Sequence, residues 1–358
     1  GKLMKTKKIF TLFFITVTLI GCNKKTSNDN WANFRGNTQN TGYYSGNAPQ
    51  KLSELKWIFK AENAVDSSPA VAEGMVFFGS YDYYLYAVDV KTGQEKWKFK
   101  TEANVISSPA VAEGMVFFGS RDNYLYAVDV KTGQEKWKFK TEASVQSSPA
   151  VAEGMVFFGS RDNYLYAVDV KTGQEKWKFK TNHHITSSPA VAGRMVFFGS
   201  LDNYLYAVDV KTGQEKWKFK TEDVVHSSPA VAEGIVFFGS FDNYLYAVDV
   251  KTGQEKWKFK TEDNVTSPAV AEDMVFIGSW DDYLYAVDVK TGQEKWKFKT
   301  GARVFSSPAV ADGMVFLGSD DNYLHAVDVK TGQEKWKFKT EAPVSSPAVA
   351  DGMVFFGS

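Results

Sequence analysis

Apolar and polar positions recur along this chain with a period of about 40 residues. In the copy from Val105 to Lys140, Met115–Ser120 is a run of β-branched and aromatic residues. Tyr124–Val130 alternates Tyr, Tyr, Val and Val with Leu, Ala and Asp, and Lys136–Lys140 places Trp and Phe on one face and lysines on the other. Period-two alternation with this composition is typical of strands, so the pattern predicts an all-β chain.

Polar turns separate these segments. This copy begins with Ser-Ser-Pro-Ala-Val-Ala, and three turns follow, at Glu113-Gly114, Arg121–Asn123 and Lys131–Gln134. In the third turn Asp129 can accept backbone hydrogen bonds, and Gly133 can adopt positive φ. Four short strands joined by three tight turns predict one four-stranded antiparallel unit, and the lysines would protect its outer edge.

Radial repetition of such units predicts a β-propeller. A β-solenoid is the alternative, but its coils are usually shorter and lack this hairpin pattern. We therefore predict an eight-bladed β-propeller of four-stranded antiparallel blades, with one tryptophan in each outer strand. The tryptophans that mark the copies are Trp57, Trp97, Trp137, Trp177, Trp217, Trp257, Trp296 and Trp336.

The last of these blades is expected to be shared by both termini. Seven copies are complete between Val65 and Lys339. Leu55–Phe59 would supply the outer strand of the shared blade, and Val344–Ser358 its two inner strands. The third strand is missing there, so either residues 41–50 fill it or the chain is cut in mid-repeat. The ending Phe-Phe-Gly-Ser favours truncation.

The N-terminus carries the features of an export signal. Lys5, Lys7 and Lys8 form a cationic start before an apolar run at Ile9–Ile20. Twelve residues span about 18 Å as a helix, too short for a hydrocarbon core of about 30 Å. The ending Leu-Ile-Gly-Cys resembles a bacterial lipobox, and Cys22 is the sole cysteine. We predict a lipoprotein signal peptide at 1–22, a tether and opening segment at 23–50, and a propeller at 51–358. An incidental cysteine after an ordinary signal peptide is the alternative.

Acylation of Cys22 would anchor the protein to a membrane. Asn23 follows the cysteine in place of Asp, which by analogy with known lipoproteins favours the periplasmic side of the bacterial outer membrane. The chain has 42 basic and 42 acidic residues, so it lacks the basic footprint of a nucleic-acid-binding protein. We expect a monomer that binds other envelope proteins.

The segment Ala127–Trp137 resembles the tryptophan-docking motif of quinoprotein-type propellers with PQQ-like repeats, Ala-x-Asp-x-x-Thr-Gly-x-x-x-Trp. This resemblance implies that each tryptophan packs between neighbouring blades and that together they form a girdle. Trp31–Asn37 resembles the segment that opens many such propellers. With the lipobox and the chain length, the motif makes the outer-membrane assembly lipoproteins of the BamB type the most similar group. Members of that group are lipid-anchored propellers that dock other proteins, although their blades diverge more than these do.

Differences between the copies are concentrated at two places in the repeat, the turn between the second and third strands and the residues just before Ser-Pro. In an up-and-down blade both places lie on one face of the disc, whereas the turns of the opposite face are nearly constant. Neutral drift at tolerant turns is the alternative explanation, but the variable set is rich in residue types of binding hot spots. We predict a partner-binding rim formed by Asp66, Tyr81, Ile106, Arg121, Gln146, Arg161, His183, His184, Thr186, Leu201, His226, Phe241, Trp280, Arg303, Phe305 and Asp320.

The same scaffold also occurs in quinone-dependent dehydrogenases. The resemblance implies that such enzymes hold pyrroloquinoline quinone near a disulfide of adjacent cysteines, with a calcium ion and an aspartate base. This chain has one cysteine and no insertion for a calcium loop, and its three rim histidines lack a further ligand. We therefore predict no catalytic residue, metal or cofactor, and a protein-docking scaffold for outer-membrane assembly. A quinone-dependent dehydrogenase and a surface-exposed ligand-binding or adhesive module are the alternatives.

Overall fold

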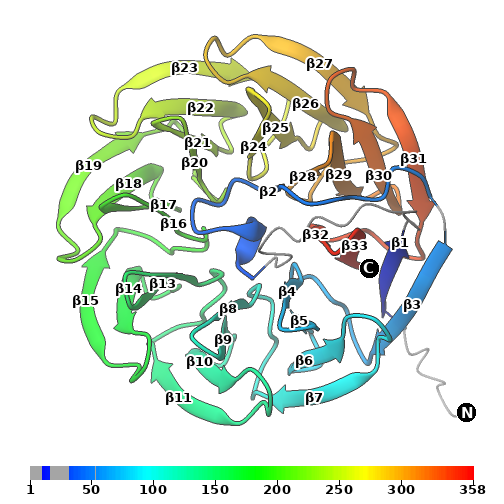
Figure 1. Cartoon of the computed structure of the whole chain (residues 1–358). Helices are drawn as coiled ribbons and strands as arrows, with labels where there is room; N and C mark the ends of the chain where they lie inside the picture. Colours follow the sequence, from blue (N-terminus) through cyan, green and yellow to red (C-terminus); the bar gives the residue numbers. More distant parts are fainter. Residues whose placement is uncertain (1–9, 17–31, 53) are drawn as a thin grey trace, which may run out of the picture.

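Each repeat folds into one sheet whose four strands follow one another from the centre of the ring to its outer edge (Figure 1). The computed structural model describes residues 10–16, 32–52 and 54–358. The innermost strands are β4 (Ala70–Ala72), β8 (Ala110–Ala112), β12 (Ala150–Ala152), β16 (Ala190–Ala192), β20 (Ala230–Ala232), β24 (Ala269–Ala271) and β28 (Ala309–Ala311). The second strands are β5 (Met75–Gly79), β9 (Met115–Gly119), β13 (Met155–Gly159), β17 (Met195–Ser200), β21 (Ile235–Gly239), β25 (Met274–Gly278) and β29 (Met314–Ser319).

The two outer positions of each blade follow the same order. The third strands are β6 (Tyr84–Asp89), β10 (Tyr124–Asp129), β14 (Tyr164–Asp169), β18 (Tyr204–Asp209), β22 (Tyr244–Asp249), β26 (Tyr283–Asp288) and β30 (Tyr323–Asp328). The outer strands are β7 (Glu95–Lys100), β11 (Glu135–Lys140), β15 (Glu175–Lys180), β19 (Glu215–Lys220), β23 (Glu255–Lys260), β27 (Glu294–Lys299) and β31 (Glu334–Lys339). All neighbouring strands within these blades are antiparallel, as the turn pattern predicts.

The ring differs from the predicted eight-bladed propeller whose last blade is shared by both termini. Seven blades are each formed by one continuous repeat, and the closing sheet is a composite with the order β3 (Glu54–Ala61), β1 (Phe10–Thr16), β33 (Met353–Gly357) and β32 (Ala348–Ala350). The sequence holds seven copies of the Tyr-Leu-Tyr-Ala-Val-Asp element, with one His substitution, so a non-repeat segment takes the third position here. The eight-bladed prediction is therefore wrong, because the repeat itself builds seven blades.

The strand β1 lies inside the predicted signal peptide. It pairs antiparallel with β33 on one side and β3 on the other. The expectation that residues 41–50 supply this strand is wrong, because Tyr43–Tyr44 form β2 beside β28 instead. Cys22 and the remainder of the predicted leader lie outside the described residues. Cleavage at Cys22 and incorporation of β1 into the sheet exclude each other.

The tryptophans of the outer strands lie between neighbouring blades. The Trp97 Nε1 group donates to the Val130 carbonyl of the next blade at 3.1 Å, and its ring lies 5.7 Å from that of Phe77. A Cβ on Gly133 would lie 2.6 Å from the Trp97 ring, and the φ of Gly133 is +69°, so glycine is required on both counts. The same indole-to-carbonyl bond recurs around the ring, ending with Trp336 donating to Pro49 at 3.1 Å.

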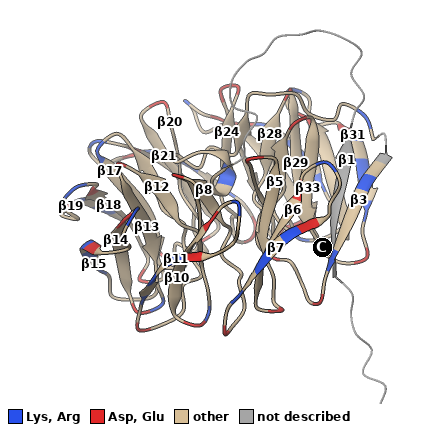
Figure 2. Cartoon of the chain, turned by 60° about the horizontal axis from the view of Figure 1, so that its bottom comes forward, with Lys and Arg blue, Asp and Glu red and all other residues tan. Residues whose placement is uncertain are grey.

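Charged residues lie mainly on the outer strands and in the turns (Figure 2). The second strands, in contrast, are almost wholly buried, with Phe117 and Phe118 at 0% exposure in β9. Apolar core therefore fills the space between blades, and solvent meets the lysine face of each outer strand. No helix among the described residues is long and apolar enough to cross a bilayer.

The described part of the opening segment plugs the centre of the ring. It contains a short 3-10 helix, η1 (Phe34–Gly36), and strand β2, which crosses the middle of the disc in Figure 1. Its carbonyl groups accept hydrogen bonds from the innermost strands of five blades. These bonds are Val111 N to Ala32 O, Val191 N to Thr38 O, Val231 N to Gln39 O, Val270 N to Thr41 O and Val310 N to Gly42 O, at 2.6–2.9 Å. The plug thus satisfies inner strand edges that would otherwise lack partners.

Candidate functional site

The two variable places of the repeat meet at one end of every blade. In each blade, the variable residue in the turn between the second and third strands donates a hydrogen bond from its backbone N–H. The acceptor is the backbone carbonyl two residues before the other variable position, which precedes the first strand. Examples are Phe241 to Val224 and Arg121 to Asn104, both at 3.0 Å. Equivalent bonds start at Tyr81, Arg161, Leu201, Trp280 and Asp320. The predicted rim residues therefore share one face of the disc.

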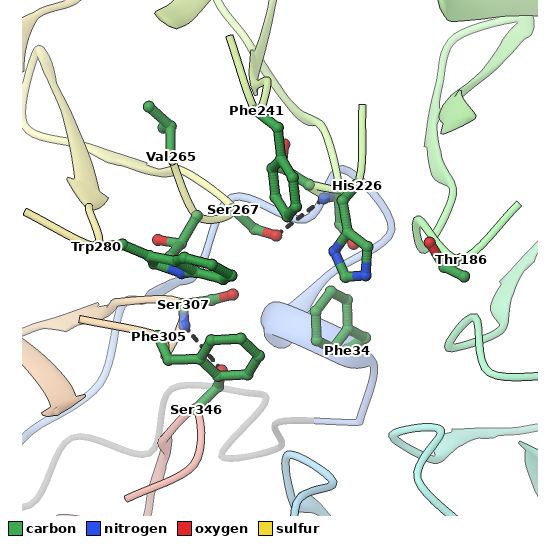
Figure 3. Close-up of a pocket in the computed structure, with 13 residues that line it drawn as sticks. Phe34, Thr186, His226, Phe241, Val265, Ser267, Trp280, Phe305, Ser307 and Ser346 are labelled. Atoms are coloured by element: carbon green, nitrogen blue, oxygen red, sulfur yellow. Dashed lines mark hydrogen bonds between the residues drawn. The ribbon is translucent and has the colours of Figure 1, made fainter. Parts of the chain in front are cut away.

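Five of these rim residues come together around one cavity, which has a volume of about 440 Å³. Thr186, His226, Phe241, Trp280 and Phe305 line it from neighbouring blades. Phe34 of the plug lines it from the central side, and the aromatic side chains surround the hollow in Figure 3. This size lies within the range of small-molecule sites.

Four rings follow one another around the cavity wall. His226 stacks on Phe241 with ring centroids 5.6 Å apart and an interplanar angle of 24°. Phe241 lies 5.5 Å from Trp280, which lies 6.0 Å from Phe305. Phe305 is 64% exposed, which is unusual for a phenylalanine in this chain. The wall therefore offers accessible aromatic faces contributed by three blades.

Serine hydroxyl groups form the polar part of the lining. Ser228, Ser267 and Ser346 each accept the backbone N–H of the preceding blade through Oγ, at 2.8–2.9 Å. No hydrogen bond donated by these three hydroxyls is found within the described ranges. The Thr186 Oγ1 atom is buried and has no hydrogen-bond partner there either. The cavity thus holds hydroxyl groups with unused hydrogen-bonding capacity.

Charge is nearly absent from the cavity lining. His226 is its one titratable side chain, and desolvation by the surrounding protein atoms lowers the pKa of His226 although its ring faces the open cavity. The nearest charges lie at the edge. There Arg303 Nη2 pairs with Asp320 Oδ2 at 3.0 Å, and the guanidinium lies 5.4 Å from the Trp280 ring centroid. The site is suited to uncharged groups.

The other predicted rim residues lie outside this cavity. Arg121 is exposed and lies 5.6 Å from the Tyr81 ring, and Asp66 raises the pKa of Tyr81 after the larger effect of burial. Asp66 and Asp320 also line a smaller hollow of about 230 Å³ beside Phe305. Ile106, Gln146 and Leu201 are partly buried, and Arg161 and His183 are exposed.

The three rim histidines do not converge. His183 and His184 touch each other with ring centroids 4.5 Å apart, and His184 Nδ1 lies 3.0 Å from Asn163 Oδ1. Burial lowers the pKa of His184, helped by the adjacent His183. His226 belongs to the aromatic cavity. Among the described residues no group of three or more His, Cys, Asp or Glu side chains is placed to hold a metal ion.

Two residues of the plug were not predicted as site residues. Phe34 forms part of the cavity, and the only signal for it was the resemblance of Trp31–Asn37 to an opening segment. Arg35 is 3% exposed, and none of its guanidinium nitrogens has a hydrogen-bond partner in the described chain. Desolvation lowers the pKa of Arg35. A buried, unpaired charge of this kind is costly to fold.

The lining does not fit the quinone site that the dehydrogenase resemblance implies. No carboxylate, amide, lysine or arginine side chain lines the cavity. The chain has no pair of adjacent cysteines. Asp122, which recurs in every blade, uses Oδ2 to accept the Glu102 N–H at 3.0 Å and the Tyr126 hydroxyl at 2.8 Å, so it links two blades.

Comparison with known proteins agrees with this fold. The structure is similar to the computationally designed protein Ika8, with a TM-score of 0.75, 20% identity, and coverage of 83% of this chain and 94% of that one. BamB from Moraxella catarrhalis has a TM-score of 0.71 and 18% identity, with coverage of 82% of this chain and 96% of that one. The quinohemoprotein alcohol dehydrogenase ADHIIG from Pseudomonas putida HK5 has a TM-score of 0.81 and 17% identity, with coverage of 92% of this chain and 75% of that one.

At these sequence identities the similarity shows the fold alone. At the level of the fold, it confirms the predicted resemblance to quinoprotein-type propellers and BamB. No curated protein has a matching sequence. A family model, described as the β-propeller of the β-alanine-activating enzyme, matches residues 156–358. Since this match spans more than half of the chain, the protein belongs to that β-propeller family.

Proposed function

We propose that this protein is a lipid-anchored propeller that docks other envelope proteins through its variable face. One observation carries the proposal: residues that differ between nearly identical copies lie together on one face of the disc. Folding alone does not require these differences, since the same blade forms with Arg121, Phe241 or Trp280 in the turn. The variation is therefore available for recognition.

The arrangement of the face supports a protein partner. Aromatic side chains gather on three neighbouring blades, the Arg303–Asp320 pair lies at their edge, and the charged residues Arg121 and Arg161 lie on other blades of the same face. Protein interfaces commonly have an aromatic core and a polar rim. Random drift at tolerant turns would scatter residue types around the ring, whereas here Phe241, Trp280 and Phe305 are consecutive.

A role in outer-membrane assembly is the more specific part of the proposal. It is supported by the lipobox at Cys22 and by the structural similarity to BamB. In this proposal the acyl chains hold the propeller at the periplasmic side of the outer membrane, and a short polar segment joins the anchor to the ring.

The test is a quantitative co-purification from envelope membranes with rim variants. Arg121→Ala and Trp280→Ala should each reduce recovery of the partners by about tenfold or more, as expected for hot-spot positions. Lys131→Ala, in an exposed turn of the opposite face, is the matched control and should leave recovery unchanged. Equal recovery with all three variants would refute docking through the variable face.

A further inference from the structure

The aromatic cavity combines two features that a purely apolar ligand cannot use together. Its walls are the ring faces of Phe241, Trp280 and Phe305, and hydroxyl groups of several serines lie beside them (Figure 3). The Oγ atoms of Ser228, Ser267 and Ser346 already accept backbone N–H groups, so their protons are directed to other acceptors. A hydrocarbon or phenyl group in the cavity would leave these hydroxyls without a partner, at a cost in affinity.

The lining also selects against charged ligands. It contains no lysine, arginine, aspartate or glutamate, and its single titratable group is His226. Arg303 at the edge is already neutralised by Asp320 at 3.0 Å. An anion would find no free counter-charge among these residues, and the Trp280 ring, which could attract a cation, already has the Arg303 guanidinium 5.4 Å from its centroid. Transfer of an unpaired charge into such a site is strongly unfavourable.

From these features we infer that the cavity binds a neutral saccharide ring. The C–H faces of a sugar pack on aromatic rings, while its hydroxyl and ring oxygens exchange hydrogen bonds with the serine and threonine hydroxyls. Thr186 Oγ1, buried and without a partner in the described chain, would gain one from a sugar hydroxyl. The volume of about 440 Å³ leaves room for a ring and its substituents. This inference goes beyond protein docking, and either one can hold without the other.

The decisive variant is Thr186→Val, which keeps the shape of the side chain and removes the partnerless hydroxyl. Because that hydroxyl is buried without a partner, its loss should leave the melting temperature unchanged or raise it. The same change should weaken saccharide binding about fivefold. Substitution of a residue that only maintains the fold would not weaken saccharide binding while leaving the melting temperature unchanged or raising it.

Titration calorimetry with maltotriose, cellotriose and tri-N-acetylchitotriose, all neutral, at millimolar concentration provides the measurement. At least one trisaccharide should bind, and Trp280→Ala should weaken it about tenfold or more through loss of a stacking face. Arg161→Ala, on the same face but outside the cavity, should have no effect. If the protein also binds the same sugar when it is immobilised on a glycan array, the natural ligand is a unit of a polysaccharide. If it binds only the free sugar, the natural ligand is a soluble saccharide.

Two counter-probes complete the experiment. Pyrroloquinoline quinone represents the anionic quinone class, and N-acetylphenylalaninamide represents an aromatic side chain of a partner protein. The inference is overturned if no trisaccharide binds, if only a counter-probe binds, or if the sugar binds Trp280→Ala and Thr186→Val as well as the original protein. Loss of sugar binding with intact partner co-purification would separate this site from the docking function.

Discussion

At the scale of single residues, the repeat separates structural from variable positions. Trp137 is 9% exposed, lies 5.7 Å from the Phe117 ring and donates to the Val170 carbonyl at 3.1 Å. Gly173 of the next blade contacts the same indole, with space for no larger residue. Each such tryptophan fills a space between two blades, which explains why it is constant. The rim residues make contacts that differ from blade to blade, such as Phe241 with Trp280 at 5.5 Å, so no one side chain is required at these positions.

Removal of one girdle tryptophan should therefore be costly. We expect Trp137→Ala to lower the free energy of unfolding by about 3–5 kcal/mol, through lost burial and the cavity left between two blades. Urea denaturation followed by circular dichroism provides the measurement, and Lys131→Ala in an exposed turn is the control. A loss below about 1 kcal/mol would show that the girdle contributes little to cohesion between blades.

At the scale of elements, the third turn of each blade is held by one aspartate. Asp129 Oδ1 accepts the N–H groups of Lys131 and Thr132 at 3.0 Å, and Asp129 Oδ2 pairs with Lys136 at 3.1 Å. Lys136 and then these N–H groups lower the pKa of Asp129 to about 2. Lys176 has the same effect on the pKa of Asp169, which is also about 2.

These turns should make the fold sensitive to acid in one pH range. The folded pKa values lie below the ordinary value of 3.8, so the folded state binds fewer protons than the unfolded state in this range. The stabilisation is present above about pH 4 and is lost as the pH falls towards about 2. Melting temperatures between pH 7 and pH 2 should show this decline, and Asp129→Asn should make it shallower. An identical pH profile for that variant would contradict the assignment.

The closing sheet gives a second prediction at this scale. In the uncleaved chain the strand β1 pairs with both β33 and β3, so deletion of residues 1–16 from that chain should cost more than about 3 kcal/mol of stability. A variant lacking only residues 1–9 retains β1 and serves as the control. Equal melting temperatures for the two variants would show that β1 does not contribute to the ring. Mass spectrometry of the exported protein tests the competing prediction that acylated Cys22 is its first residue.

At the scale of the whole molecule, periodicity in the sequence was sufficient to predict the blade but not the closure of the ring. Strand order, turn positions and the place of Trp97 all follow from local patterns that recur in each copy. The composite sheet depends on pairing between Phe10–Thr16 and a strand more than 300 residues away, and no repeat encodes that pairing. The third strand of that sheet is therefore Phe10–Thr16 and does not come from residues 41–50.

The candidate site shows the same division. Variation between copies identified His226, Phe241 and Trp280 as residues of one face. It could not show that Phe34 reaches the same cavity, because the plug is not part of the repeat. The unused donor capacity of the serine hydroxyls could not be predicted either, since Ser-Pro is constant in the copies and its role depends on contacts between blades.

Photo-crosslinking from single positions on the two faces tests the central claim most directly. On the variable face, a photoreactive residue replaces Arg121, Arg161 or Trp280. On the opposite face, it replaces Lys131 or Glu153, which are exposed residues of turns. After irradiation of intact cells, we predict crosslinks to envelope proteins from the first three positions and none from the last two. Crosslinks from the opposite face alone, or equally from both faces, would contradict the conclusion that binding is confined to the variable face.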